Sequence, residues 1–320
     1  MSGSYLPPPL SKAFIWRRAH SLTGIWLVLF LIEHLLTNSQ AALFIGDDGS
    51  GFVSAVNFIK GLPYLPIIEI ALLGIPFLIH GVWGIQYLLQ GKMNAFPTDG
   101  STPSLPQYSR NHAYTWQRIT SWILLFGIAA HVIQMRFLEY PSSGQLDGQQ
   151  YYLVRLSRDS GLFTLSKRLG FDLYSATQIK EISKNTLEQL GPLEAVEDTP
   201  NQLIEAQRNR ERKEWVAALE EQKLNETDIL AVSKSFGMAE LLMVRDTFKS
   251  PLMIFLYSGL VLAACFHAFN GLWTFMISWG ITLTAASQNL MRKFATGLMV
   301  LIAFLGLAAI WGTYWLNLTT

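Results

Sequence analysis

Charged residues and cysteine are both scarce in this sequence. Only 15% of its 320 residues are charged while 50% are hydrophobic, and most of the charges fall between Tyr140 and Lys249. The single cysteine, Cys265, excludes an intramolecular disulfide and any CxxC metal site. The net charge of +1, with no basic stripe interleaved with aromatic residues, gives no indication of nucleic-acid binding. The composition instead predicts a membrane protein.

Five long apolar runs account for most of the sequence outside the charged region. They cover residues 21–45, 65–90, 116–138, 251–278 and 294–316. Each is long enough to cross a hydrocarbon core of about 30 Å. The first run has no small-residue cleavage site after it, so we expect a retained helix and not a signal peptide. Pro76 lies inside the second run, which membrane helices tolerate when neighbouring groups satisfy the freed backbone. The predicted fold is all-α, an integral membrane bundle of five transmembrane helices.

Basic residues in the short loops predict which helix ends face the cytoplasm. Arg17 and Arg18 precede the first run, Arg292 and Lys293 lie in the fourth connection, and no basic residue follows the last run. By the positive-inside rule, the N-terminus and the even-numbered connections face the cytoplasm, and the third connection faces outward. The many basic residues of that third connection do not contradict this orientation, because long loops translocate largely regardless of charge.

The third connection, residues 140–249, is too long for a structureless loop in a compact protein. It contains helical-looking stretches such as L-I-E-A-Q-R-N-R-E-R-K-E-W-V-A-A-L-E-E-Q. We therefore expect a mostly helical extramembrane insertion on the outer side, between residues 1–139 with helices one to three and residues 250–320 with helices four and five. A solvated cap on the outer membrane face and a partner-docking module or lid are both open readings.

Four of the six histidines lie well inside four different apolar runs: His34, His80, His131 and His267. A histidine in an apolar span is costly and usually functional, although each one alone could also be a hydrogen-bonding residue between packed helices. At a rise of about 1.5 Å per residue, His34 and His131 fall roughly 20 Å from the cytoplasmic edge, and His80 and His267 about 22–24 Å from the outer edge. They therefore form two level pairs separated by about 12–15 Å.

Two imidazoles on facing helices are the axial ligands that a b-type haem requires in a bundle core. Two such haems stacked across the membrane would conduct electrons, and both would be non-covalent because C-x-x-C-H attachment is excluded. A glycine lies four residues from three of the histidines: Gly127 before His131, Gly84 after His80 and Gly271 after His267. Glycine on the same helix face leaves room for a flat macrocycle, although small residues also favour plain helix contact.

The spans contain two acidic residues, Glu33 and Glu69, and no lysine or arginine in their central parts, which argues against an ion pump. Glu33 points about 100° away from His34 around the helix. Glu69, near the outer end of the second helix, is a candidate for proton transfer to a bound quinone and equally for a hydrated interfacial acid. His20 and His112 lie at cytoplasmic span ends, where hydration is the default interpretation.

Several motifs around these histidines are similar to those of one family of membrane cytochromes. They are W-R-R-A-H-S-L-T-G at 16–24, F-L-I-E-H-L at 30–35, L-I-H-G-V-W-G at 78–84, Q-R-I-T-S at 117–121, A-A-H-V at 129–132, F-H-A-F-N-G-L-W at 266–273 and W-G-I-T at 279–282. Together they resemble the cytochrome b subunit of succinate:quinone oxidoreductases, which comprise succinate dehydrogenase and fumarate reductase. The type is the single-anchor, five-helix, di-haem one of many bacteria, and the match covers all five spans but not residues 140–249.

The resemblance implies two haem b groups, a proximal one ligated by His80 and His267 and a distal one ligated by His34 and His131. It implies a flavoprotein subunit with FAD and an iron–sulfur subunit on the cytoplasmic face of the bacterial cytoplasmic membrane. Electrons would pass from succinate through FAD, the iron–sulfur clusters, the proximal haem and the distal haem to a quinone, expected to be menaquinone, or in the opposite direction during fumarate reduction.

By the same resemblance, residues at the inner edge are candidates for binding haem propionates or a proximal quinone: Arg17, Arg18, His20, Ser21 and Arg118. The sequence departs from the family in its long outer insertion and at Cys265, where some fumarate reductases of this type carry a proton-transferring glutamate. Two other interpretations stay open: a di-haem b subunit of a hydrogenase or formate dehydrogenase, and a transporter whose histidines relay protons.

Overall fold

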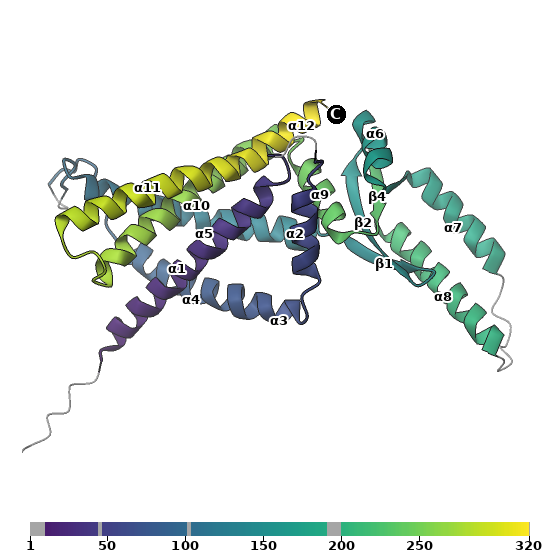
Figure 1. Ribbon diagram of the computed structural model, residues 1–320, viewed down its shortest axis with the longest axis horizontal. Helices are drawn as coiled ribbons and strands as arrows, with labels where there is room; N and C mark the ends of the chain where they lie inside the picture. Colours follow the sequence, from purple (N-terminus) through teal and green to yellow (C-terminus); the bar gives the residue numbers. More distant parts are fainter. Residues whose placement is uncertain (1–9, 44–46, 101–103, 191–199, 320) are drawn as a thin grey trace, which may run out of the picture. The chain divides into compact units, whose positions relative to one another are not determined.

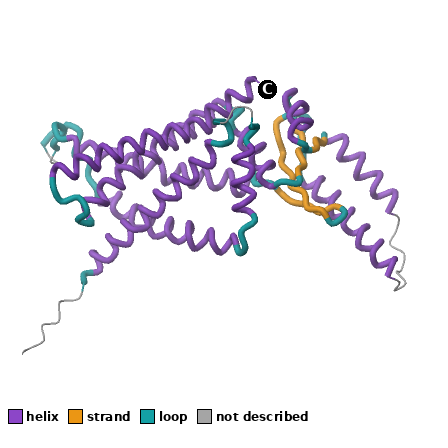
Figure 2. The backbone as a smooth tube through the Cα atoms, in the orientation of Figure 1, coloured by secondary structure: helices purple, strands orange, loops and turns teal. Residues whose placement is uncertain are grey.

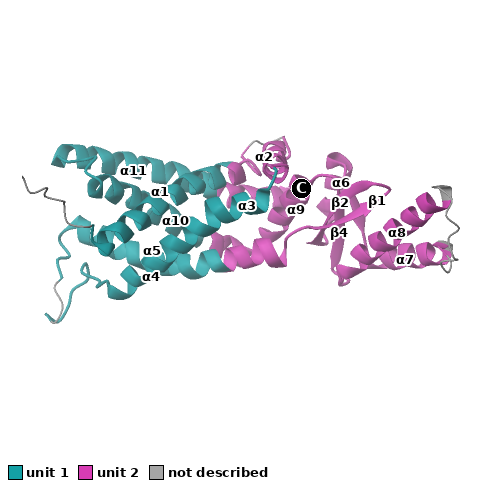
Figure 3. Ribbon diagram, turned by 90° about the horizontal axis from the view of Figure 1, so that it is seen from below, with its two compact units in different colours: residues 1–36, 63–129, 258–306 teal, residues 37–62, 130–257, 307–320 magenta. Residues whose placement is uncertain are grey.

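The computed structural model describes residues 10–43, 47–100, 104–190 and 200–319 (Figure 1). The chain divides into two compact units, each assembled from segments that are distant in the sequence (Figure 3). Unit 1 consists of Met1–Leu36, Pro63–Ala129 and Ser258–Gly306. Unit 2 consists of Thr37–Leu62, Ala130–Tyr257 and Leu307–Thr320. Unit 1 therefore holds the greater part of the apolar runs, and unit 2 holds the charged third connection.

Within the described residues, five helical stretches are long and apolar enough to cross a membrane, as predicted. They are Lys12–Ser39, Leu65–Gln90, Ser109–Leu138, Pro251–Ser278 and Ala285–Thr319. Their mean hydropathy lies between 1.5 and 2.3, and at most 28% of each apolar window is buried within the protein. Most of their apolar side chains therefore lie on outer surfaces, where lipid and not water is the compatible solvent.

The elements of these spans are as follows. The first span is α1 (Lys12–Ser39), and the second consists of α3 (Leu65–Glu69), η1 (Ile70–Gly74) and α4 (Ile75–Gln90). The third consists of α5 (Ser109–Val132) and η2 (Ile133–Leu138), and the fourth is α10 (Pro251–Ser278). The fifth consists of α11 (Ala285–Leu307), η3 (Ala308–Gly312) and α12 (Thr313–Thr319).

Three of the predicted helices are too short at their N-terminal ends. The first, third and fifth helices begin at Lys12, Ser109 and Ala285, seven to nine residues before the predicted starts at 21, 116 and 294. Hydrophobicity marks only the lipid-embedded part of a helix, whereas its backbone hydrogen bonding continues into the polar interface, where long basic side chains reach water. Arg17 and Arg18 consequently lie on α1 and not before it.

Pro76 is accommodated by a neighbouring helix. Proline has no backbone N–H, so the carbonyl of Leu72, four residues earlier, lacks its usual helical donor. The indole Nε1 of Trp26 on α1 donates to that Leu72 oxygen at 2.5 Å. The backbone group freed by Pro76 is therefore satisfied from outside the helix, as expected for a membrane span. The adjacent π-helical turn η1, one of three such turns in the described spans, absorbs the change in winding.

The insertion contains a four-stranded antiparallel sheet, which corrects the expectation of an all-α fold. Its helices still contribute more residues than its strands, as predicted for a mostly helical insertion. Its strands are β1 (Ser142–Leu146), β2 (Gln149–Ser157), β3 (Asp172–Tyr174) and β4 (Asp228–Ser233), in the order β1-β2-β4-β3 (Figure 2). Asp147 and Gly148, with φ of 50° and 74°, form the two-residue turn between β1 and β2. An Asp-Gly pair with positive φ is the preferred tight hairpin turn, so this signal was present in the sequence.

Helices cover both faces of this sheet. They are α6 (Ser160–Leu169), α7 (Ala176–Leu190), α8 (Pro200–Glu221) and α9 (Phe236–Thr247). On one face, Leu153 and Leu230 pack with Trp215 and Leu219 of α8 in a buried apolar cluster. On the other face, α9 packs against β2 and β4, as Figure 1 shows. The central strand β4 is therefore buried on both sides, which is why its residues do not alternate between buried and exposed.

Unit 2 also contains α2 (Ser50–Lys60), which packs along α9. The side-chain Oδ1 of Asn57 accepts a hydrogen bond from the backbone N–H of Gly237 at 2.8 Å, and its Nδ2 donates to Ser235 Oγ at 2.9 Å. A second connection is the ion pair in which Arg168 Nε and Nη2 each donate to Asp48 at 2.9 Å. The first connection of the chain is thereby tied to the insertion.

Candidate functional site

Three histidines from three helices meet in unit 1. The rings of His80 on α4 and His267 on α10 have centres 6.2 Å apart, with their planes at 80°. The ring of His20 on α1 stacks on His80 with centres 4.1 Å apart and planes at 11°. The structure therefore brings together the predicted pair His80 and His267, and it adds His20, which the sequence placed at a hydrated helix end.

Hydrogen bonds determine which ring nitrogen of His80 and His20 carries the proton. His80 Nδ1 lies 3.1 Å from the backbone oxygen of His20, and His20 Nδ1 lies 3.1 Å from the backbone oxygen of His80. A carbonyl oxygen can only accept, so both Nδ1 atoms must be protonated. In the neutral imidazole, Nε2 then carries the lone pair that a metal ion can bind.

The same proton assignment holds for His267. Its Nδ1 lies 3.4 Å from Ser121 Oγ, and that hydroxyl donates its single proton to the backbone oxygen of Gln117 at 2.7 Å. Ser121 must therefore accept from His267 Nδ1–H, which leaves the lone pair on Nε2. Gln117 Nε2 also donates to the backbone oxygen of His267 at 3.1 Å, and Asn270 Nδ2 donates to Gln117 Oε1 at 2.7 Å. These bonds fix α5 against α10 beside the ligand position.

The glycines near the histidines lie against side chains of neighbouring helices. A Cβ added at Gly127 would meet Leu260 Cδ1 at 2.7 Å, so Gly127 permits close helix packing. A Cβ at Gly84 would lie 3.7 Å from His20 Cε1. The sequence reading missed Gly24, where a Cβ would meet His80 Cε1 at 2.9 Å, tighter than ordinary contact. Gly24 is therefore the glycine that makes room for a histidine ring.

The second predicted pair is divided between the units. His34 on α1 belongs to unit 1, where its ring lies against Phe30 with centres 5.4 Å apart and planes at 27°. His131 on α5 belongs to unit 2, where its Nδ1 lies 3.2 Å from the hydroxyl of Tyr257. The pairing of His34 with His131 stays a prediction.

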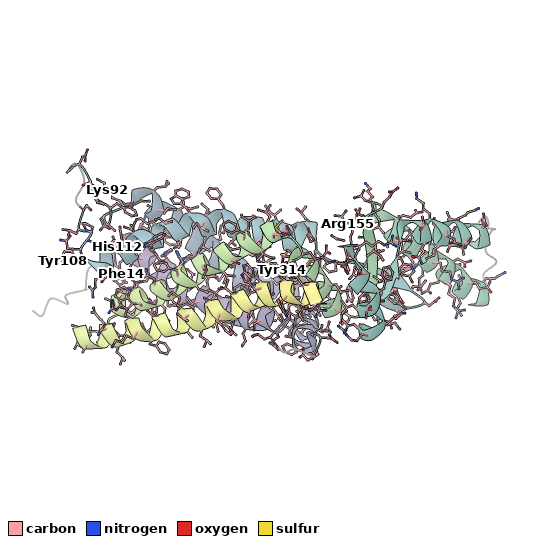
Figure 4. All side chains as sticks on the ribbon, turned by 90° about the horizontal axis from the view of Figure 1, so that it is seen from above. Phe14, Lys92, Tyr108, His112, Arg155 and Tyr314 are labelled. Atoms are coloured by element: carbon pink, nitrogen blue, oxygen red, sulfur yellow. The ribbon has the colours of Figure 1, made fainter. Side chains whose placement is uncertain are left out.

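The residues of unit 1 that the sequence predicts at the inner edge differ in their environments. Arg17 is exposed, whereas Arg18 Nη1 donates to the backbone oxygen of Ser278 at 2.9 Å and its guanidinium lies over the Trp279 ring at 4.5 Å. Ser21 Oγ accepts from Trp279 Nε1 at 3.1 Å. Arg18 and Ser21 thus attach α1 to the end of α10. Figure 4 labels Phe14 and His112 at the same end of unit 1, as expected if the N-terminus and the second connection face one side.

Three buried donors in unit 1 have no hydrogen-bond partner within the described residues: Arg118 Nε, Trp273 Nε1 and Thr282 Oγ1. Arg118 Nη1 donates to the backbone oxygen of Tyr114 at 3.2 Å, and its guanidinium lies 3.3 Å from the centre of the Tyr114 ring. A buried donor without an acceptor costs about 1–3 kcal/mol, so such groups indicate a missing acceptor. Arg118 was a candidate from the sequence, and Trp273 was not.

Glu69 and Cys265, which the sequence analysis discussed as possible proton-transfer positions, both lie in the spans. Glu69 is the last residue of α3, directly before the π-helical turn η1. Cys265 is buried on α10, two residues before His267. Neither residue belongs to the His20, His80 and His267 group.

A comparison with curated proteins finds a succinate dehydrogenase cytochrome b558 subunit of Bacillus subtilis (strain 168). It is 24% identical to the chain over 301 residues, which cover 94% of this chain and 96% of the relative. This cytochrome b subunit is a homologue of the chain. The resemblance found in the histidine motifs is thereby confirmed. No protein-family profile matches the chain, and no solved structure matches it.

The geometry of His80 and His267 fits the haem that a cytochrome b contains. A metal–imidazole bond is about 2 Å long and a ring nitrogen lies about 1 Å from its ring centre, so two imidazoles on opposite sides of one iron have centres about 6 Å apart. The observed separation is 6.2 Å. Both Nδ1 atoms have a hydrogen-bond acceptor, which is the usual second partner of a metal-bound histidine.

Proposed function

We propose that the chain is the membrane anchor and electron conduit of a succinate:quinone oxidoreductase. Its homologue is named as a succinate dehydrogenase cytochrome b subunit, which supports a place in an enzyme complex without dicarboxylate chemistry of its own. The observation that carries the proposal is the His80–His267 pair, whose 6.2 Å spacing and Nδ1 hydrogen bonds suit two axial ligands of one haem b.

His34 and His131 are proposed as the ligands of a second, distal haem b. Haem groups bound at these two levels supply one-electron transfer, and the chain's own residues hold the ligand rings in place. His20 O and Ser121 Oγ orient the proximal ligands through their Nδ1–H groups. The apolar spans around them exclude water. The chain's part in the reaction is therefore binding, orientation and insulation of the electron path.

The unpartnered donors at Arg118 and Trp273 support an acceptor group at the inner end of unit 1. Haem propionates and a quinone carbonyl both have oxygen atoms that accept such hydrogen bonds. Arg17, His20 and Ser21 complete the proposed inner-edge set. Glu69 is the proposed proton-transferring residue for a quinone, with menaquinone as the expected substrate.

The proposed partners are a flavoprotein with FAD and an iron–sulfur subunit on the cytoplasmic face of a bacterial membrane. In this arrangement the N-terminus lies in the cytoplasm and residues 140–249 form a separate domain outside. Cysteine labelling tests the topology: K184C, at a side chain 74% exposed on α7, should react only from the outer side. K92C, in the second connection, should react only from the cytoplasm. Labelling of K184C from the cytoplasm would overturn the orientation.

A redox difference spectrum of the purified chain tests the cytochrome proposal. Low-spin, bis-histidine bands at two haems per chain are expected, and their absence would instead favour a transporter with histidine relays. Co-purification of a flavin-containing subunit with succinate-dependent haem reduction is expected in the native membrane. Co-purification with a hydrogenase or formate dehydrogenase subunit would assign the di-haem chain to another respiratory complex.

A further inference from the structure

The hydroxyl of Tyr257 links two side chains of the third span in unit 2. Tyr257 lies near the start of α10, and its hydroxyl is 3.2 Å from His131 Nδ1. The same hydroxyl donates to Gln134 Oε1 at 3.0 Å. Gln134 lies three residues after His131, in the π-helical turn η2, so both partners project toward the same side of the helix. Tyr257 therefore bridges the proposed distal ligand and the turn that follows it.

The direction of the two hydrogen bonds follows from the number of protons available. A tyrosine hydroxyl has one proton, and Gln134 Oε1 can only accept, so Tyr257 donates to Gln134. The Tyr257 oxygen must then accept from His131, which places the proton on Nδ1. Nε2 of His131 consequently carries the lone pair. This is the tautomer that iron ligation through Nε2 requires.

Ring packing holds Tyr257 in place independently of its hydroxyl. Its ring meets the His131 ring edge-on, with centres 5.6 Å apart and planes at 80°. On another side it meets Phe248, with centres 5.4 Å apart and planes at 89°. Edge-to-face pairs of this kind are favourable by about 0.5–1.5 kcal/mol each. Replacing the tyrosine by phenylalanine should thus remove the hydrogen bonds and keep the packing.

We propose that Tyr257 is a positioning residue for His131 and lowers the reduction potential of the distal haem. The inference rests on the proposed function, because it requires His131 to be a haem ligand. A hydrogen bond from Nδ1–H to the Tyr257 oxygen makes the imidazole more basic and favours the oxidised iron. Gln134 strengthens this effect, since accepting the tyrosine proton makes the tyrosine oxygen a better acceptor.

The test is a spectroscopic redox titration of Y257F in membranes that contain the whole enzyme complex. Both haems should remain, and one of them should become easier to reduce by about tenfold, which is 59 mV for a one-electron couple. The other haem should titrate as in the wild type. Q134L, which leaves Tyr257 in place, should shift the same haem in the same direction by a smaller factor. The EPR signal of that haem should change in both variants.

Y174F is the matched control, because it removes one hydroxyl from β3 of the same unit. Neither haem should shift in this variant. Unchanged potentials in Y257F with both haems present would overturn the positioning role while leaving the proposed function intact. If Y257F loses a haem, Q134L decides, and an unshifted potential there would overturn the proposal. A wild-type chain without bis-histidine haem would instead contradict the proposed function itself.

Discussion

The imidazole rings of His80 and His267 lie nearly perpendicular to each other in unit 1, with centres 6.2 Å apart and planes at 80°. The two residues are 187 positions apart in the sequence and come from α4 and α10. Helical rise predicts the same depth for both, and their observed separation agrees with the proposal that they are two axial ligands of one haem. Their Nδ1–H groups are bound by a backbone carbonyl and a serine hydroxyl, so both rings present Nε2 with a lone pair.

Replacing either member of this pair should remove one haem and spare the other. H80A or H267A is expected to reduce the haem content of the purified chain from two to one, measured by pyridine haemochrome and by the redox difference spectrum. The reason is that a haem held by one axial imidazole is bound less tightly than a haem held by two.

H112A is the control for this experiment, because His112 bonds the backbone oxygen of Pro106 at 2.6 Å and lies at a span end. It should retain both haems. H34A and H131A should each remove the other haem and leave the first spectrum. Loss of both haems from every single variant would argue against two separate pairs.

An added methyl group at Gly24 should disturb the ring of His80. In G24A the new Cβ would meet His80 Cε1 at 2.9 Å, which forces the ring or α1 to move by a few tenths of an ångström. We expect a shifted absorption band and potential for the proximal haem and a lower haem occupancy. G81A is the matched control, since nothing lies within 4 Å of its Cβ although it is adjacent to His80. Equal effects of the two variants would contradict this role of Gly24.

Stability near neutral pH should depend on Glu240 of α9. Burial raises the pKa of Glu240 to about 7 from 4.5, with Arg136 and Lys60 partly opposing the shift. A raised carboxyl pKa stabilises the folded state fully below about 4.5, and this contribution is lost as the pH rises through about 7. E240Q lacks the penalty of burying the ionised form.

The melting temperature of E240Q in detergent should therefore exceed that of the wild type at pH 8 and approach it at pH 5. The expected difference in the free energy of unfolding at pH 8 is about 1–3 kcal/mol. E214Q is the control, because that side chain is 65% exposed on α8 and should change the profile little. A pH-independent difference between E240Q and the wild type would count against ionisation of Glu240 as the cause.

The contact between α2 and α9 should not tolerate a side chain at Gly237. A Cβ there would overlap the backbone oxygen of Val53 and come within 3.0 Å of its Cα, and backbone atoms cannot rotate away. G237A should destabilise unit 2 by about 1–3 kcal/mol, measured by chemical or thermal unfolding. G259A on α10 is the control, because nothing lies within 4 Å of its Cβ. Unfolding of G237A at the wild-type midpoint would show that α2 can move aside.

The β-sheet of the insertion was not predicted from the sequence. One pair of its strands has a local signal in the sequence, and another pair has none. The hairpin turn at Asp147 and Gly148 is visible in the sequence, and it predicts the β1–β2 pair. The pairing of β2 with β4 joins residues more than 70 positions apart, for example Tyr152 with Ser233, so no short window could indicate it. The strongly charged helical stretch of α8 lies between these strands and dominated the prediction.

At the candidate site, too, some residues could be predicted from the sequence and others could not. His34, His80, His131 and His267 could be selected from the sequence because each is a polar residue within a long uncharged run. The partners of their Nδ1 atoms could not be selected. Ser121 and Tyr257 are ordinary residues of their own helices, and they acquire a role only when a histidine from another helix lies beside them.

The sequence by itself determined the five apolar helices and the position of each histidine along its helix, because hydropathy and helical rise are properties of consecutive residues. Only the tertiary structure decided that His20 stacks on His80, that Trp26 satisfies the carbonyl freed by Pro76, and that Tyr257 sets the tautomer of His131. Each of these depends on the rotation of one helix about its axis relative to a neighbour. That rotation is fixed by packing between residues distant in the chain.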